Sequence, residues 1–180
     1  MSPPQQRDRQ QRDRDPAGRA RNARPRDELG RPLDRRAAGE PTVPDDLGLG
    51  PAEALDQAQQ LLDAGRPFHA HEVLEAAWRA APPGERDLWQ GLAQIAVGLT
   101  HARRGNGRGA VALLRRGAQG VAGYARACPH AVDAAAVASA ATELAARIAG
   151  DGLAAVTEAQ LRLKLRGRSS GAEARGPTSG

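Results

Sequence analysis

One short stretch of the sequence, residues 68–78, brings together the residue types that acid/base and metal chemistry use. On a helix of 3.6 residues per turn, His71 and Glu75 lie about one turn apart and point in the same direction. Glu72 lies beside them. A carboxylate in this group can serve as a general base, and the imidazole can serve as an acid, a base or a metal ligand.

A second line of polar residues follows one face of the next predicted helix, over residues 85–104. Its members are separated by about whole helical turns, and they are Gln90, Gln94 and His101. Between positions 88 and 102 this segment has no Asp, Glu, Lys or Arg, which is typical of a central helix buried on most sides. Buried polar groups need hydrogen-bond partners, so we expect this line to face His71 and Glu75 in a buried His/Glu/Gln network.

Two interpretations of this cluster stay open. In the first it is a catalytic or metal site. The candidate catalytic residues are His71, Glu72, Glu75, Gln94 and His101, and the candidate metal ligands are His71, Glu75 and His101. The order His-Glu-x-x-Glu has the spacing of the zincin motif His-Glu-x-x-His with a weaker second ligand, and no motif points to a particular cofactor. In the second interpretation, which we favour, the cluster is a structural network that fixes the register of the helices.

Apolar residues recur at helical spacing in five segments, each bounded by Pro, Gly or a capping residue. The predicted helices are 51–64, 67–81, 85–104, 108–124 and 134–149, with Asp133 as the cap of the last. Gly91 and Gly98 inside the third helix each cost roughly 1 kcal/mol relative to Ala, so we expect another helix to approach closely there. Thr157 with Gln160 predicts a short further helix. The pattern predicts an all-α fold, a compact bundle of about five helices built from antiparallel helical hairpins.

Charge divides the chain into three parts. Residues 1–50 hold 11 Arg, 9 acidic residues and 7 Pro without apolar periodicity, a composition typical of disordered chains. The following residues, up to 161, have a net charge of −1, whereas residues 162–180 have a net charge of +4. We therefore predict a disordered Arg/Pro-rich tail over 1–50, a helical bundle domain over 51–150, and a short helix followed by a basic disordered tail over 151–180.

The composition also limits location and partners. The only cysteine, Cys128, excludes an intramolecular disulfide. No stretch approaches the roughly 20 apolar residues of a membrane span, and the first residues contain no apolar run for a secretory signal. We expect a soluble, cytoplasmic protein without membrane contact. Weak, non-specific polyanion binding by the tails is one expected interaction, and a homo-oligomer or a protein partner is the other.

Three separated motifs resemble a known family, the small helical domain of unknown function 309. They are the runs AGRPFHAHEVLEAAWR and ERDLWQGLAQ and the turn RGNGRGA. The characteristic positions of the family fall on Phe68, His71, Glu72, Glu75, Trp78, Gln90, Gly91, Gln94, Asn106, Gly109 and Ala110. One departure is His69, which stands where the family usually has Glu and which we expect on the flank of its helix. The resemblance covers about residues 52–124 and implies an all-α bundle, but no activity.

Three functional hypotheses follow. The favoured one is a structural or protein-interaction module with the polar cluster buried in its centre. The second is a metal-dependent or acid/base hydrolase-type enzyme that uses His71, Glu72 and Glu75, so enzymatic activity is left open. The third is a nucleic-acid accessory protein that acts through the basic tails. Solvent access to the cluster separates the first two, because a sealed cluster indicates a scaffold and an open one indicates a site.

Overall fold

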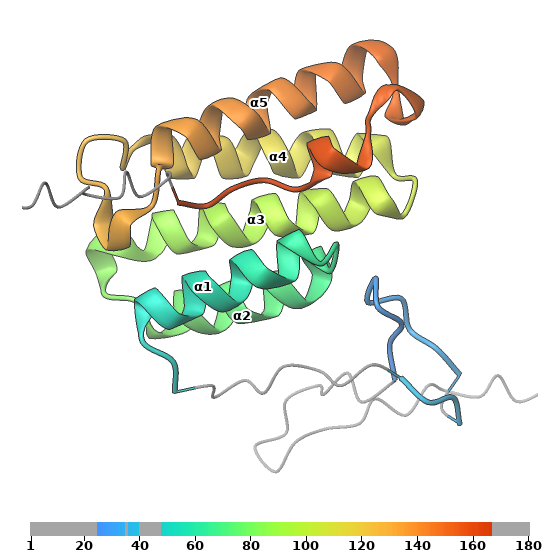
Figure 1. Cartoon of the computed structure of the whole chain (residues 1–180), viewed down its shortest axis with the longest axis horizontal. Coiled ribbons are helices and arrows are strands. Elements are labelled where there is room, and N and C mark those ends of the chain that lie inside the picture. The colour runs from blue at the N-terminus through green and yellow to red at the C-terminus, as the bar shows by residue number, and fades with distance from the viewer. Residues whose placement is uncertain (1–24, 35, 40–47, 167–180) are drawn as a thin grey trace, which may run out of the picture.

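The structure, a computed structural model, describes residues 25–34, 36–39 and 48–166. These residues hold five α-helices and no strand, which confirms the predicted all-α bundle (Figure 1). The helices are α1 (Pro51–Asp63), α2 (Pro67–Ala80), α3 (Arg86–Arg103), α4 (Gly107–Ala122) and α5 (Ala134–Asp151). Most of the two tails predicted to be disordered, namely 1–24, 35, 40–47 and 167–180, lies outside the described residues. Within the described ranges, no helix combines the length and the apolarity that a membrane crossing requires.

Two of the helices, α2 and α5, begin as the sequence predicts. Pro67 occupies the first position of α2, where its missing amide hydrogen would have no helical partner. The Asp133 side chain accepts a hydrogen bond from the Ala136 amide, 3.1 Å away, and so caps α5 as predicted. Asn106 caps α4 in the same way, through the Gly109 amide at 2.9 Å.

The central helix is α3, which packs against α2 and α4 (Figure 1). Glycines on both partners allow the close approach to α4 that the sequence predicts. A Cβ atom on Gly91 would lie 2.8 Å from the Gly117 carbonyl oxygen, and one on Gly98 would lie 2.9 Å from the Leu114 side chain. The face of α3 that carries these two glycines therefore points towards α4.

Residues 162–166 form an extended strap that, together with Leu161 before it, adds to the core beyond the domain end predicted at residue 150. Leu161, Leu163 and Leu165 are buried and alternate with basic residues, a period of two that is typical of extended chain. The side-chain amide of Gln59 donates to the Leu163 carbonyl at 3.2 Å and accepts from the Leu165 amide at 2.7 Å. The predicted capping box before the strap does form, but the helix that follows it is a single 3₁₀ turn, Glu158–Leu161.

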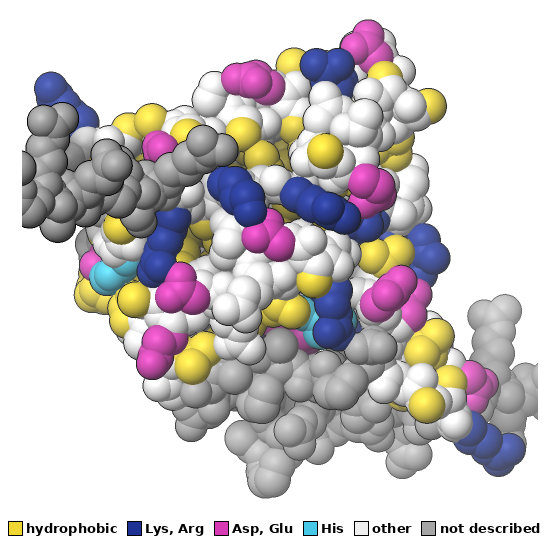
Figure 2. All heavy atoms as spheres, viewed as in Figure 1, with side chains coloured by type: hydrophobic (Ala, Val, Ile, Leu, Met, Phe, Trp, Pro, Cys, Tyr) yellow, Lys and Arg dark blue, Asp and Glu magenta, His cyan; other side chains and the backbone are white. Residues whose placement is uncertain are grey.

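Basic residues of the strap pair with acidic residues of α1. The Lys164 ammonium lies 2.8 Å from both oxygens of Asp63, and Arg166 donates to Asp56. On the face shown in Figure 2, Lys and Arg side chains lie beside Asp and Glu side chains and do not gather into one basic patch. Two of the three basic residues at positions 162–166 are therefore paired with acidic residues of the bundle.

Part of the segment predicted to be disordered, residues 25–33, forms a closed N-terminal hairpin. The Asp27 amide donates to the Arg31 carbonyl at 3.0 Å. The Asp27 carboxylate in turn accepts from the Leu29 amide at 3.0 Å and from the Arg31 amide at 2.7 Å, as in an Asx turn. Gly30 closes the hairpin with a φ of +73°, a conformation that glycine adopts without steric cost.

Candidate functional site

The two lines of polar residues that the sequence predicts to face one another do not meet in the structure. Gln90 and Gln94 line a polar groove of about 570 Å³ between α3 and α4. His71 and Glu75 lie on α2, where they bind each other. Among the described side chains, no hydrogen bond joins either of them to Gln94. The prediction of one buried His/Glu/Gln network is therefore wrong.

The glycines of α3 explain this outcome. Gly91 and Gly98 stand three residues before and four residues after Gln94, so all three lie on one face of the helix. A Cβ at either glycine would collide with α4, so this face of α3 packs against α4. The side-chain amide of Gln94 lies on the same face and therefore also points towards α4. The sequence contained this signal, because the same glycines that predict close approach also share a face with the polar line.

His101 stabilises the turn between α3 and α4 and does not join His71. The Oδ1 of Asn106 accepts from the Gly109 amide, so its Nδ2 donates to His101 Nδ1 at 2.8 Å. Burial lowers the pKa of His101, and the positive charge of Arg104 acts in the same direction. A neutral imidazole is the form that can accept a hydrogen bond at Nδ1.

His71 and Glu75 do form the predicted pair, at the edge of the bundle. Nε2 of His71 lies 3.2 Å from one Glu75 oxygen, and Arg79 lies 2.8 Å from the other. The side chains of His71 and Glu75 are 22% and 33% exposed, so the pair is partly buried, and Nδ1 of His71 is fully buried. Burial lowers the pKa of His71 against the opposing charge of Glu75, and the nearby charges of Arg79 and Arg26 add to the lowering. The pair is thus a neutral imidazole beside an ion-paired carboxylate.

The two neighbours of His71 take different positions. His69 is 3% exposed and places Nε2 3.3 Å from a guanidinium nitrogen of Arg66, so the expectation of a flank position is wrong. α2 packs against both α1 and α3, and its buried arc is therefore wider than one apolar stripe. Glu72 is half-buried on α2.

Phe68 at the start of α2 and Arg104 after the end of α3 form a docking surface, the Phe68 face, on which the N-terminal hairpin lies. Nε of Arg104 donates to the Leu29 carbonyl at 2.8 Å, and its Nη2 donates to the same oxygen. Gly30 packs against the ring so closely that a Cβ there would lie 2.2 Å from a ring carbon. The guanidinium carbons of Arg26 and Arg104 lie 5.6 and 6.0 Å from the ring centroid, within the range of cation–π attraction.

The candidate metal ligands do not come together. His101 lies at the turn between α3 and α4, whereas His71 and Glu75 lie on α2. In the part of the chain that is described, no three His, Cys, Asp or Glu side chains are placed to hold one metal ion. The predicted ligand set therefore does not fit a metal centre.

Sequence analysis missed a second His–Glu pair. Nε2 of His130 lies 2.7 Å from a Glu85 oxygen, and the Trp89 indole donates to the same oxygen at 3.3 Å. The hydrogen bonds from His130 and Trp89 lower the pKa of Glu85 against the raising effect of burial. The pair joins the loop before α5 to the start of α3, and no local spacing could have predicted a contact over that separation.

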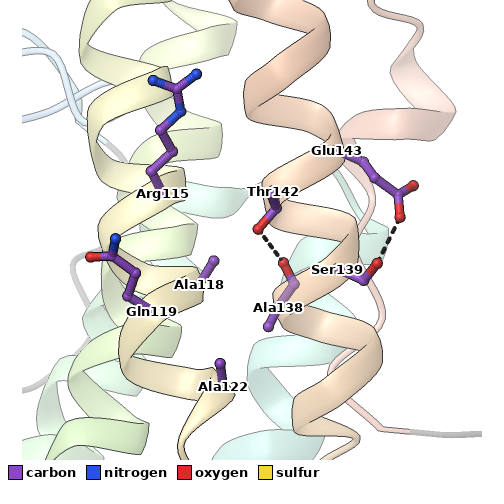
Figure 3. A pocket seen from close by; sticks show the side chains of 8 residues that line it. All are labelled: Arg115, Ala118, Gln119, Ala122, Ala138, Ser139, Thr142 and Glu143. Atoms are coloured by element: carbon purple, nitrogen blue, oxygen red, sulfur yellow. Dashed lines mark hydrogen bonds between the residues drawn. The ribbon is translucent and has the colours of Figure 1, made fainter.

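A further groove, of about 550 Å³, lies between α4 and α5 (Figure 3). Its lining includes Ala118 and Ala122 of α4 and Ala138 of α5. Arg115 stands on the α4 rim and Glu143 on the α5 rim. These residues follow no motif that the sequence analysis singled out.

Comparisons with known proteins agree with the resemblance seen in the motifs. Residues 55–113 match the model of the family described as "Domain of unknown function (DUF309)". Over 48 residues the chain is 46% identical to the uncharacterized protein YpuF of Bacillus subtilis (strain 168), a match that covers 26% of this chain and 28% of that relative. No solved structure matches the chain. From α1 into α4, the chain is therefore similar to the DUF309 family.

Proposed function

We propose that the chain is a protein-interaction module whose Phe68 face binds a turn-forming segment of a partner protein. The observation that carries the proposal is the way in which the N-terminal hairpin is held. Arg104 donates twice to one backbone carbonyl, that of Leu29. Recognition through the backbone tolerates different side chains in the bound segment, so a partner turn of the same shape fits the same surface.

The ring of Phe68 limits which residues a partner segment can place against this surface. Arg26 supplies a cation above the ring, and Gly30 supplies a residue without a side chain where the ring leaves no room for a Cβ. The partner segment is therefore a tight turn with an arginine four residues before a glycine. The chain's own hairpin occupies the surface until such a segment displaces it.

The test releases the hairpin and offers it back as a separate peptide. In Gly30→Ala the new methyl group meets Phe68 at 2.2 Å and strains a φ of +73°, so the hairpin leaves the surface. We expect the full-length Gly30→Ala chain to bind a synthetic peptide of residues 25–34 saturably, with NMR shift changes at the start of α2 and the end of α3. The wild-type chain should bind it at least about 10-fold more weakly, because its tethered hairpin competes at high effective concentration.

The matched control is Gly48→Ala. Gly48 also has a positive φ, of +57°, but a Cβ there would meet nothing within 4 Å, so this variant should behave as the wild type does. Phe68→Ala in the Gly30→Ala background should abolish peptide binding. A Gly30→Ala chain that binds no peptide, or that binds it equally well without the Phe68 ring, contradicts the proposal.

One observation favours a second candidate, acid/base chemistry at His71 and Glu75. A neutral imidazole oriented by a carboxylate is the arrangement that general-base catalysis uses, and the Glu75 side chain is 33% exposed, although Nδ1 of His71, the ring nitrogen that does not face Glu75, is buried. His71→Asn separates the candidates, because it removes the proton-transfer group but keeps Phe68 and Arg104. Under this candidate the variant loses turnover of test esters and phosphate esters, whereas under the docking proposal it keeps peptide binding.

The hypothesis of a nucleic-acid accessory protein is not favoured by a specific contact. Lys164 and Arg166 of the strap bind Asp63 and Asp56, and most of the two tails lies outside the described residues. Weak polyanion binding by the tails therefore stays a hypothesis.

A further inference from the structure

We infer that the groove between α4 and α5 is the contact surface for a second copy of this chain. Three of its eight lining residues are alanines, Ala118, Ala122 and Ala138, and the other five are polar or charged (Figure 3). The small side chains let another helical surface approach closely. This inference is independent of the Phe68 face, which lies on α2 and α3.

The charges on the two rims identify the occupant. Arg115 on α4 and Glu143 on α5 are both exposed, and both stand near the same end of the groove (Figure 3). In the described structure neither side chain takes part in an ion pair, and Glu143 accepts a hydrogen bond only from Ser139, at 2.7 Å. A single copy thus presents one positive and one negative rim at the same level, both available to a partner.

A two-fold axis parallel to the groove makes these rims complementary to themselves. Such a rotation places α4 of one copy opposite α5 of the other and keeps the height of each residue along the groove. Arg115 of each copy then meets Glu143 of the other, so that two equivalent ion pairs flank the alanines. An isologous interface requires this reciprocity, whereas an axis across the groove would move the charges to opposite ends.

The size of the surface sets the expected strength. α4 has 16 residues, hence a length of about 24 Å, and two adjacent helices are roughly 20 Å wide, which gives about 500 Å² per copy. The total of roughly 1,000 Å² is at the lower limit for a specific interface. We therefore expect a reversible dimer that forms with increasing concentration and weakens as salt screens the rim charges.

Sedimentation equilibrium of the full-length chain over a range of concentrations tests the inference, with a reducing agent present because Cys128 is exposed. Arg115→Glu places two acidic rims opposite each other, and Glu143→Arg places two basic rims opposite each other. Each variant alone should dimerise at least about 10-fold more weakly than the wild type, since both symmetry-related pairs change together. An equimolar mixture of the two variants should restore the dimer as a heterodimer.

Restoration in the mixture shows that both variants are folded and that the two residues meet across the interface. Arg116→Glu is the matched control, because Arg116 is the next residue on α4 but lines the groove towards α3. That variant should dimerise as the wild type does. A wild-type chain that stays monomeric up to about 1 mM, or a mixture that associates no better than its separate components, overturns the inference.

Discussion

His71 and His101 are held neutral by the same physical cause at two unrelated places. Burial is the main reason why the pKa of each lies below its ordinary value. Nε2 of the neutral His71 donates to the Glu75 carboxylate. Nδ1 of His101 accepts from the side-chain amide of Asn106, the residue that caps α4. At the scale of the residue, His101 stabilises the turn between α3 and α4, whereas His71 pairs with Glu75 within α2.

This protonation behaviour predicts a pH-dependent stability. An unfolded chain takes up a proton on each imidazole near the ordinary value of 6.5, and the folded chain takes it up only at lower pH. The unfolded state therefore binds more protons below pH 6.5, so the free energy of unfolding falls as the pH decreases from there through the lowered pKa values. Urea denaturation at pH 7.5 and pH 5.5 should show a smaller loss for His71→Gln than for the wild type. An unchanged loss would mean that His71 is not held neutral in the folded chain.

The sequence predicted contacts within one helix better than contacts between helices. A spacing of four residues was enough to pair His71 with Glu75, because helical geometry fixes that distance. Helical geometry leaves open which neighbour a face meets, so Gln94 was assigned to the wrong interface. The Glu85–His130 pair depends on the path of a loop, which no periodicity encodes.

At the scale of the element, the helix boundaries followed from local chemistry and the strap did not. Proline, glycine and capping residues mark the ends of the five helices in the sequence, and the structure has helices at the same places. The alternation of Leu161, Leu163 and Leu165 with basic residues is the pattern of an extended half-buried segment. The basic residues of this segment led to the prediction of a disordered tail, although Lys164 and Arg166 pair with acidic residues of α1.

The contact between α3 and α4 predicts opposite effects for two glycine substitutions. A Cβ on Gly117 would lie 2.6 Å from the Gly91 carbonyl oxygen, and backbone cannot move aside as a side chain can. Gly117→Ala should therefore lower the free energy of unfolding by about 1–3 kcal/mol. Gly150 lies in α5 with nothing within 4 Å of its Cβ position, so Gly150→Ala should raise it by roughly 0.5–1 kcal/mol. Urea denaturation measures both, and a Gly117→Ala variant that is as stable as the wild type would contradict the close approach.

At the scale of the whole molecule, segments that are far apart in sequence complete the fold. The strap lies along α1 through Gln59, and its Leu165 carbonyl accepts from the Asp133 amide at the start of α5 at 3.1 Å. The first and last helices are thereby joined by residues beyond the predicted end of the domain. The family match covers residues 55–113, so Gln59 lies within the matched segment, whereas the strap and α5 lie outside it.

The last prediction concerns Gln59, which holds the strap by its backbone. Gln59→Ala leaves the Leu163 carbonyl and the Leu165 amide without their partner in a buried segment, and should lower the free energy of unfolding by about 1–3 kcal/mol. Gln60→Ala is the control, since Gln60 is exposed on the same helix, and should change it by less than about 0.5 kcal/mol. Gln59→Glu keeps the acceptor for the Leu165 amide and loses only the donor to Leu163, so its effect should lie between the two.

Amide hydrogen exchange locates the effect that urea denaturation measures. The Leu165 amide should exchange faster in Gln59→Ala than in Gln59→Glu, because only the second variant still offers it an acceptor. If the two variants exchange this amide at the same rate, the hydrogen bond from the Leu165 amide to Gln59 does not hold the strap. In that case the buried leucines, the ion pairs to α1 and the hydrogen bond from the Asp133 amide would join the first and last helices without the side-chain amide of Gln59.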